Sequence, residues 1–234
     1  MIPLHDDNPT TIRPIVTVSL IAACVLVFVW QVSHDARGQQ LVVYSLGAIP
    51  AVLFGERQLP AELAVVPAYV TLVTSMFMHG GWMHLIGNML YLWIFGNNVE
   101  DAMGHGRFVI FYLLCGIAAA MSHAIPNADS VIPMVGASGA ISGILGAYVL
   151  LHPRARVLIL IPLGFFSQLI YVRAVIVLGI WFVLQLVSSV LRGGEGGGIA
   201  FGAHIGGFVA GMVLIAFFKH RDVRLENPLR GFTR

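Results

Sequence analysis

Long uncharged apolar runs separate the polar parts of this sequence, and they constrain the fold more than any other feature. The run from residue 15 to residue 33 contains no charged side chain. A helix that crosses a membrane needs about 20 consecutive apolar residues, because each residue advances the helix by about 1.5 Å through a hydrocarbon layer about 30 Å thick. The sequence therefore predicts a helical membrane protein with several spans.

The composition points the same way. Hydrophobic residues make up 58% of the 234 residues and charged residues only 10%, whereas a soluble domain carries about 25% charged residues. The net charge is +2 and the basic residues lie in loops rather than in patches, so we do not expect nucleic acid as a partner. Cys24 and Cys115 both lie in apolar runs and are typical of buried hydrophobic residues, not of a disulfide or a metal site.

Six apolar segments are predicted to span the membrane, at about residues 15–33, 73–95, 108–123, 137–152, 174–190 and 199–218. Residues 34–70 are too polar and too often interrupted by proline to cross, so we expect a long loop with short helices in the interface. Residues 157–173 are apolar but contain Pro162 and Gly164, and we expect a connection at the membrane surface. The predicted fold class is an all-α bundle of six transmembrane helices.

The whole chain, residues 1–234, is predicted to be one polytopic membrane domain. It would consist of an N-terminal segment (1–14), a six-helix core (15–218) and a basic tail (219–234). Six spans place both termini on one side, and ten of the 13 lysines and arginines fall on that side. The positive-inside rule therefore predicts cytoplasmic termini. Residues 1–14 lack secretory and transit patterns, which favours a prokaryotic plasma membrane.

This topology places four polar side chains, from three helices, at a similar shallow depth below the outer surface. They are His84 and Asn88 in the second span, Ser138 at the start of the fourth, and His204 in the sixth. A serine hydroxyl needs a neighbouring base before it can attack a carbonyl, and imidazole suits this task near neutral pH. We therefore predict that Ser138 is a nucleophile and His204 its base.

The same pattern contains groups that could stabilise an oxyanion. His84 and Asn88 are four residues apart, so they share one helix face. The backbone N–H of Ser138 would lie at a helix N-terminus, where amides are unpaired and negative charge is favoured. These three donors would supply an oxyanion site.

Small residues would allow the fourth and sixth spans to approach closely. Glycines recur on the fourth span at residues 139, 143 and 146, and on the sixth at residues 207 and 211. The predicted spans contain no aspartate or glutamate, so we expect a Ser–His dyad without a third member. The lack of carboxylates also disfavours a proton-coupled transporter. A transporter or channel that uses the same polar groups stays open as an alternative on the residues alone.

The chain resembles the rhomboid family of intramembrane serine proteases over roughly residues 70–215. Four segments carry the resemblance: Phe-Met-His-Gly-Gly-Trp-Met-His-Leu-Ile-Gly-Asn-Met at 77–89, Phe-Gly-Asn-Asn-Val-Glu-Asp at 95–101 with Gly104 and Arg107-Phe108, Gly-Ala-Ser-Gly-Ala at 136–140, and Ala-His-Ile-Gly-Gly at 203–207 with Gly211. The resemblance implies a Ser138–His204 dyad with His84, Asn88 and the Ser138 backbone as the oxyanion site. It also implies a partly embedded first loop over residues 34–70.

The same resemblance implies cleavage of single-pass transmembrane proteins near the outer boundary of the lipid bilayer, without a metal or organic cofactor. Several positions would then be structural: Gly136, Gly139, Gly143, Gly207, Gly211, Glu100 and Arg107. His79 also matches the motif, and a structural bond is expected there.

One position departs from part of the family. Some members carry a tyrosine four residues after the serine, stacked on the histidine, and here that position is Ser142. What holds the His204 ring is therefore open. The runner-up function is a non-catalytic rhomboid-like protein that binds client transmembrane helices, although both Ser138 and His204 are present.

Overall fold

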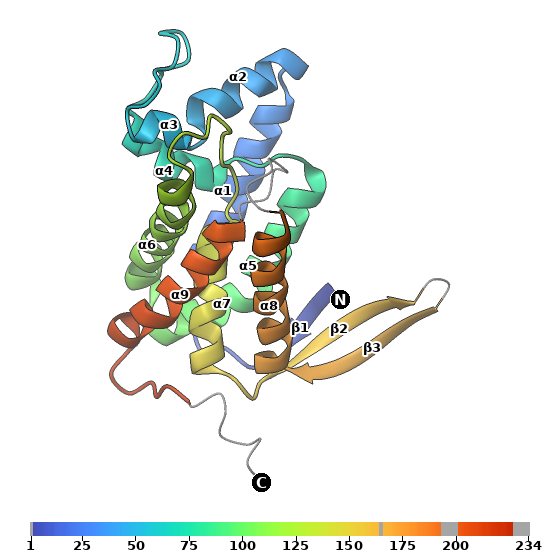
Figure 1. Ribbon diagram of the computed structural model, residues 1–234. Coiled ribbons are helices and arrows are strands. Elements are labelled where there is room, and N and C mark those ends of the chain that lie inside the picture. The colour runs from blue at the N-terminus through green and yellow to red at the C-terminus, as the bar shows by residue number, and fades with distance from the viewer. Residues whose placement is uncertain (1, 164–165, 193–200, 227–234) are drawn as a thin grey trace.

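The computed structural model describes residues 2–163, 166–192 and 201–226, and it is mostly helical (Figure 1). Within these ranges six helices of 14 to 22 residues form a bundle: α1 (Ile15–Val32), α5 (Trp82–Met103), α6 (His105–Ala124), α7 (Ser138–Leu151), α8 (Ala174–Arg192) and α9 (Phe201–Phe218). Each of these helices overlaps one segment predicted to span a membrane, although α5 begins nine residues after the start of the predicted second span and ends eight residues beyond it. The Gly-rich loop at 193–198, the start of the sixth predicted span and the end of the basic tail lie outside the described residues.

Short helices follow α1, at one end of the bundle (Figure 1). They are α2 (Ala36–Leu46), α3 (Pro50–Leu53), η1 (Ala68–Val70), α4 (Thr71–Thr74) and η2 (Ser75–Phe77). A further single turn, η3 (Ile125–Asn127), follows α6. Helices α2, α3 and η1 lie in the predicted long loop at 34–70, whereas η2 lies in the start of the predicted second span. The place of the loop relative to a membrane stays a prediction.

Three helical segments in the described ranges are long and apolar enough to cross a membrane: Ile15–Val32, His105–Asn127 and Phe201–Phe218. The apolar helix α7 has only 14 residues, so its length of about 21 Å is shorter than a hydrocarbon layer of about 30 Å. The multiple apolar helices of the described ranges are consistent with an integral membrane protein. The number of crossings and their direction stay predictions.

Helix α7 is the centre of the bundle. It packs against α5, α6 and α9, and every residue from Ala140 to Val149 is buried. Its large side chains Ile144, Leu145 and Tyr148 join one hydrophobic core with Phe95 and Phe111. A helix that is hydrophobic on all sides is stable only where it is surrounded, and here the neighbouring helices surround it.

The all-α prediction is wrong in one respect, because the chain also forms a three-stranded antiparallel sheet of order β1-β2-β3. Strand β1 (Ile2–Asp6) pairs with β2 (Arg156–Leu163), which pairs with β3 (Phe166–Arg173). The hairpin of β2 and β3 occupies the segment expected to be a surface connection and projects from the side of the bundle (Figure 1). Paired strands satisfy the backbone donors and acceptors of an apolar segment that does not form a helix.

A buried polar cluster holds β1 against the bundle. The Asp6 carboxylate accepts hydrogen bonds from the Tyr148 hydroxyl at 2.5 Å and from Asn98 Nδ2 at 2.7 Å. Asp6 is only 3% exposed, and this burial raises its pKa above the ordinary value. The predicted polar N-terminal segment is therefore partly a strand, anchored to α5 and α7.

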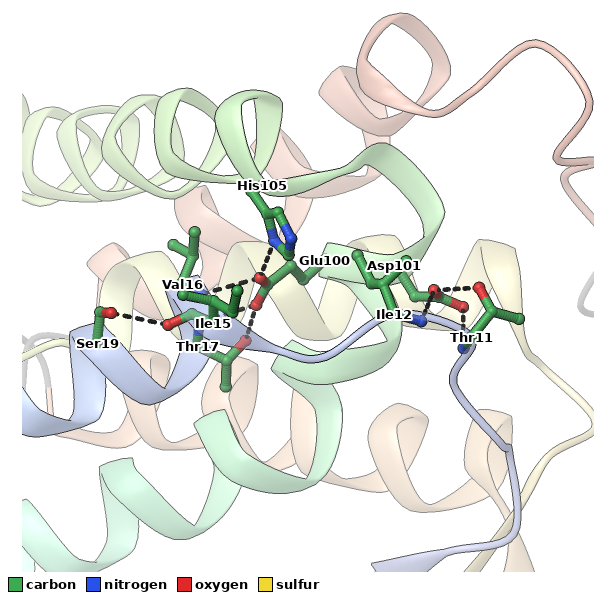
Figure 2. Close-up of polar contacts among 9 residues, drawn as sticks. All are labelled: Thr11, Ile12, Ile15, Val16, Thr17, Ser19, Glu100, Asp101 and His105. Atoms are coloured by element: carbon green, nitrogen blue, oxygen red, sulfur yellow. Dashed lines mark hydrogen bonds and ion pairs between the residues drawn. The ribbon is translucent and has the colours of Figure 1, made fainter.

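Glu100 anchors the N-terminus of α1 (Figure 2). Its carboxylate accepts hydrogen bonds from the backbone N–H groups of Val16 and Thr17, at 2.9 and 2.8 Å, and from the Thr17 hydroxyl at 2.6 Å. His105 Nδ1 lies 2.6 Å from the same carboxylate. The first N–H groups of a helix lack partners within that helix, and a negative charge there is favoured. A side chain of α5 therefore caps α1.

The connection between α5 and α6 is very short. Glu100 and Asp101 belong to the last turn of α5, Arg107 belongs to the first turn of α6, and Gly104 separates the two helices. Asp101 continues the anchor, because it accepts hydrogen bonds from the backbone N–H groups of Thr11 and Ile12.

We expect Glu100→Ala to lower the free energy of unfolding by about 3 kcal/mol, because it leaves buried N–H donors of α1 without an acceptor. Thermal unfolding in detergent micelles measures the change. Glu62→Ala removes an exposed carboxylate and should stay within about 0.5 kcal/mol of the unmodified chain. Equal stabilities of the two variants would contradict the anchoring role of Glu100.

Candidate active site

Ser138 and His204 meet at the interface of α7 and α9. Ser138 is the first residue of α7, and His204 lies in the first turn of α9. The distance between Ser138 Oγ and His204 Nε2 is 2.8 Å, which is within hydrogen-bond range for a nucleophile and its base. Two residues separated by 66 positions in the chain are thus in direct contact.

Glycines make this contact possible, because they bring the backbones of α7 and α9 together. A Cβ atom at Gly207 would overlap the carbonyl oxygen of Gly139, and one at Gly211 would overlap the carbonyl oxygen of Gly143. On the other helix, a Cβ at Gly146 would overlap the carbonyl oxygen of Phe208. Side chains at these positions would force the helices apart and separate Ser138 from His204.

His84 lies beside the loop that leads into α7. Gly136 has φ of +127°, a region that L side chains rarely adopt. A Cβ built there would be 2.8 Å from His84 Nε2 and 3.6 Å from Ser138 Oγ, so both atoms lie close to the same point. Glycine at this position leaves the space between the imidazole and the hydroxyl free.

The hydrogen bonding of His84 indicates which ring nitrogen carries the proton. The backbone N–H of Gly80 donates to His84 Nδ1 at 3.3 Å. A neutral imidazole whose Nδ1 accepts has its hydrogen on Nε2. His84 Nε2–H is therefore available as a donor on the side of Gly136 and Ser138.

Asn88 lies one helical turn after His84 on the same face of α5. The side chain is 8% exposed, and its Nδ2 atom is buried without a hydrogen-bond partner in the described part of the chain. A buried amide donor without a partner is costly. A ligand oxygen that accepts from Nδ2 would remove this cost.

His79, which also matches the motif, is held through its backbone. Gln31 Nε2 donates to the carbonyl oxygen of His79 at 2.8 Å, and His79 Nδ1 lies 3.3 Å from the carbonyl oxygen of Phe77. The rings of His79 and His84 contact each other edge-on, with centroids 5.2 Å apart. His79 therefore links α1 to the segment before α5.

A small cavity of about 50 Å³ lies next to Ser138. Its wall includes the side chains of Ser75 and Ser138 and the small residues Gly116, Ala119 and Gly139. A single water molecule needs about 10–15 Å³ and two or more polar partners. The cavity is large enough, and polar enough at its serine side, to hold water beside Ser138.

The His204 ring is held from α8, a contact that the sequence reasoning missed. His204 Nδ1 lies 2.7 Å from Gln185 Oε1, and the Trp181 ring lies 5.9 Å from the His204 ring, between centroids, at an angle of 38°. Ser142 does not take part, because its hydroxyl donates to the carbonyl oxygen of Ser138 in its own helix. The signal in the sequence is Gln185, an isolated amide in an otherwise apolar segment, whereas the expectation of a dyad rests only on the lack of carboxylates in the spans.

Glu100 and Arg107 lie away from Ser138, where α5 ends and α6 begins. The Arg107 guanidinium donates to the carbonyl oxygens of Phe218 and Lys219 at 3.4 and 3.5 Å. Cations near the last carbonyls of a helix are favourable. Arg107 therefore holds the end of α9, while Glu100 holds the start of α1. No group of three histidine, cysteine, aspartate or glutamate side chains in the described ranges is arranged to hold a metal ion.

The structure thus places a serine at the N-terminus of a buried helix, inside a bundle of apolar helices and in contact with a histidine of a second helix. Residues 67–221, more than half of the chain, match the rhomboid domain. The chain belongs to the rhomboid family and is homologous to rhomboid proteases.

Curated relatives extend this result. The chain is 28% identical to Rhomboid protein 1, mitochondrial, of Saccharomyces cerevisiae over 212 residues, covering 82% of this chain and 58% of the relative. It is 37% identical to Rhomboid protease GluP of Bacillus subtilis over 143 residues, covering 61% and 25%. Presenilin-associated rhomboid-like protein A, mitochondrial, of Danio rerio is 28% identical over 167 residues, covering 69% and 40%. The match therefore spans less than two thirds of each of these relatives.

We expect Gly207→Ala to lower the free energy of unfolding by more than about 2 kcal/mol, because its Cβ would overlap the Gly139 carbonyl oxygen. The unfolding midpoint in detergent measures this effect. Gly179→Ala is the matched control, since no atom lies within 4 Å of a Cβ at that helical position, and alanine is the better helix former. A Gly207→Ala variant as stable as the control would contradict the requirement for close helix approach.

Proposed function

We propose that this protein is an intramembrane serine endopeptidase that cleaves single-pass transmembrane proteins with a Ser138–His204 dyad. The observation that carries the proposal is the 2.8 Å contact between Ser138 Oγ and His204 Nε2, made inside a bundle of apolar helices. Membership of the rhomboid family supports the class of reaction. No metal or organic cofactor takes part in the proposed reaction.

The proposed first step transfers the Ser138 hydroxyl proton to His204 Nε2 while Oγ bonds to the carbonyl carbon of the scissile peptide. The carbonyl π electrons move to oxygen and form an oxyanion. Collapse of this intermediate breaks the C–N bond, and His204 donates its proton to the leaving nitrogen. A water molecule then hydrolyses the acyl-enzyme by the same two steps, with His204 again as the base.

The oxyanion would be stabilised by three donors. Asn88 Nδ2 is buried and without a partner in the described residues, which supports its role as a donor that bonds only to a reacting substrate. His84 is set up to donate from Nε2, because its Nδ1 accepts from Gly80. The backbone N–H of Ser138 opens α7, where the helix dipole favours negative charge.

The geometry also supports a supply of water. Hydrolysis inside a bundle of apolar helices requires water next to the acyl-enzyme, and the cavity beside Ser138 has room and polar partners for it. Because α7 has only 14 residues, its first residue would lie below the membrane surface at the end of a loop rather than at the surface itself. Ser138 would therefore act at a shallow depth.

The proposed topology has six spans in a single polytopic domain with both termini cytoplasmic, so the site opens toward the outer face of a prokaryotic plasma membrane. The bias of basic residues supports this direction. Contacts at one end of α5 support the placement of both termini on one side, because Asn98 bonds to Asp6 near the N-terminus and the carbonyl of Ala102 accepts from the backbone N–H of His220 after α9. Both ends of the described chain thus lie at the same end of the bundle.

We expect Ser138→Ala to abolish cleavage of a reporter single-pass transmembrane protein in liposomes without changing the unfolding midpoint. The same variant should lose covalent labelling by a fluorophosphonate probe, and labelling of Ser138 in the intact chain should require His204. Cleavage by Ser138→Ala at the original rate would refute the dyad. A folded intact chain that is neither labelled nor active would instead favour a non-catalytic protein that binds client helices.

Asn88→Ala should reduce kcat by about 10²- to 10³-fold, because one oxyanion donor is lost. The change in KM should be small, since the donor acts on the transition state more than on the bound substrate. Asn97→Ala is the control on the same helix, since the Asn97 amide oxygen accepts from the backbone N–H of Asn98. Equal kcat values for the two variants would exclude Asn88 from the oxyanion site.

A further inference from the structure

Gln185 makes a hydrogen bond that determines the protonation pattern of His204. Its Oε1 atom lies 2.7 Å from His204 Nδ1, and an amide oxygen can only accept. Nδ1 must therefore carry the hydrogen, and in a neutral imidazole the other nitrogen, Nε2, is then the acceptor. Nε2 is the atom 2.8 Å from Ser138 Oγ. The two contacts of the ring are thus consistent with one tautomer, which is the one able to take the serine proton.

The same helix also places an aromatic ring next to His204. Trp181 precedes Gln185 by four residues, so the two side chains share one face of α8. The Trp181 ring lies 5.9 Å from the His204 ring at 38° and also contacts Phe208 on α9. One helix therefore contacts the imidazole both at Nδ1 and through the ring of Trp181, which restricts the movement of the ring.

An amide in a membrane helix ordinarily forms hydrogen bonds that hold neighbouring helices together. The contacts of Gln185 differ from this role. In the described residues its side chain bonds to His204 alone, and it does not bond to the backbone of a neighbouring helix. The surrounding positions Val183, Leu184, Leu186 and Val187 are exposed. A half-buried amide in this apolar surface is directed at the proposed base.

We propose that Gln185 is a positioning residue for the dyad, so that α8 supplies a third, uncharged member that orients His204. This inference rests on the proposed protease function. Gln185 would not touch the substrate's reacting atoms. It would hold Nε2 of His204 unprotonated and directed at Ser138, a task that the buried carboxylate performs in Ser–His–Asp enzymes.

The contact between Gln185 and His204 depends on how α8 is positioned against α9. Its buried side chains in the described range are Ala174, Val177 and Leu178, in the first two turns. Beyond them, Gln185 and Trp181 provide the links from α8 to His204. Displacement of this half of α8 from α9 would therefore release the imidazole, so the proposed dyad is correctly arranged only while α8 is packed in place.

The test compares three variants of the full chain, reconstituted in liposomes with a fluorogenic transmembrane substrate. Gln185→Met keeps the length of the side chain but cannot accept a hydrogen bond. Gln185→Glu keeps an acceptor oxygen at the same reach. Leu184→Met is the matched control, since Leu184 is exposed on the same turn. The measurements are kcat, KM, the rate of fluorophosphonate labelling at Ser138 and the unfolding midpoint.

We expect Gln185→Met to lower kcat and the labelling rate by about 10- to 100-fold, since misplacing a catalytic group by about 1 Å costs up to about 100-fold. KM should stay within about twofold and the unfolding midpoint should not change, because the substrate does not contact Gln185 and its surroundings are apolar. Gln185→Glu should recover most of the lost kcat, and Leu184→Met should match the unmodified chain.

Normal turnover by Gln185→Met, with Ser138→Ala inactive, would overturn the positioning role and leave the protease function intact. Equal losses in the Met and Glu variants would also overturn it, because an acceptor oxygen would then not matter. If Gln185→Met fails to fold, Gln185→Asn, which keeps the amide but withdraws it by one methylene, must show the selective loss of kcat. An unmodified chain that neither cleaves nor labels would refute the proposed function itself.

Discussion

The contact between the backbones of α7 and α9 is the constraint on which the site depends. Gly207 and Gly211 pack directly on the carbonyl oxygens of Gly139 and Gly143, at a separation that no other residue permits. This approach sets the 2.8 Å distance between Ser138 and His204. In an apolar bundle, where burial provides little drive for helices to associate, such packing is a main source of specificity.

The residues that could be identified from the sequence are those whose chemistry is unusual for their surroundings. Ser138, His204, His84 and Asn88 are polar groups in apolar segments, and intramembrane polar residues are expensive enough to require a reason. The glycine spacing at 139, 143, 207 and 211 was also readable, because four-residue spacing places glycines on one helix face. These features follow from residue type and spacing, together with the predicted order of the spans.

The features that could not be predicted depend on pairing between distant parts of the chain. The β2–β3 segment is apolar on both faces, with Leu158 and Leu160 alternating with the buried Val157 and Ile159, so the alternation that identifies a strand is absent. The contact of Gln185 with His204 depends on how α8 is rotated against α9. Sequence spacing within one helix contains no information about that rotation.

Strand β1 can pair with its partners only after most of the chain has been synthesised. Ile2 pairs with Leu160, and Asp6 bonds to Tyr148, 142 residues further along the chain. Residues 2–6 are synthesised before α7 and β2, so they find these partners only after both elements have been made. Contacts of such long sequence separation are slow to form because the intervening chain must first be ordered. Docking of β1 therefore requires that α7, the helix that contains Ser138, has already formed.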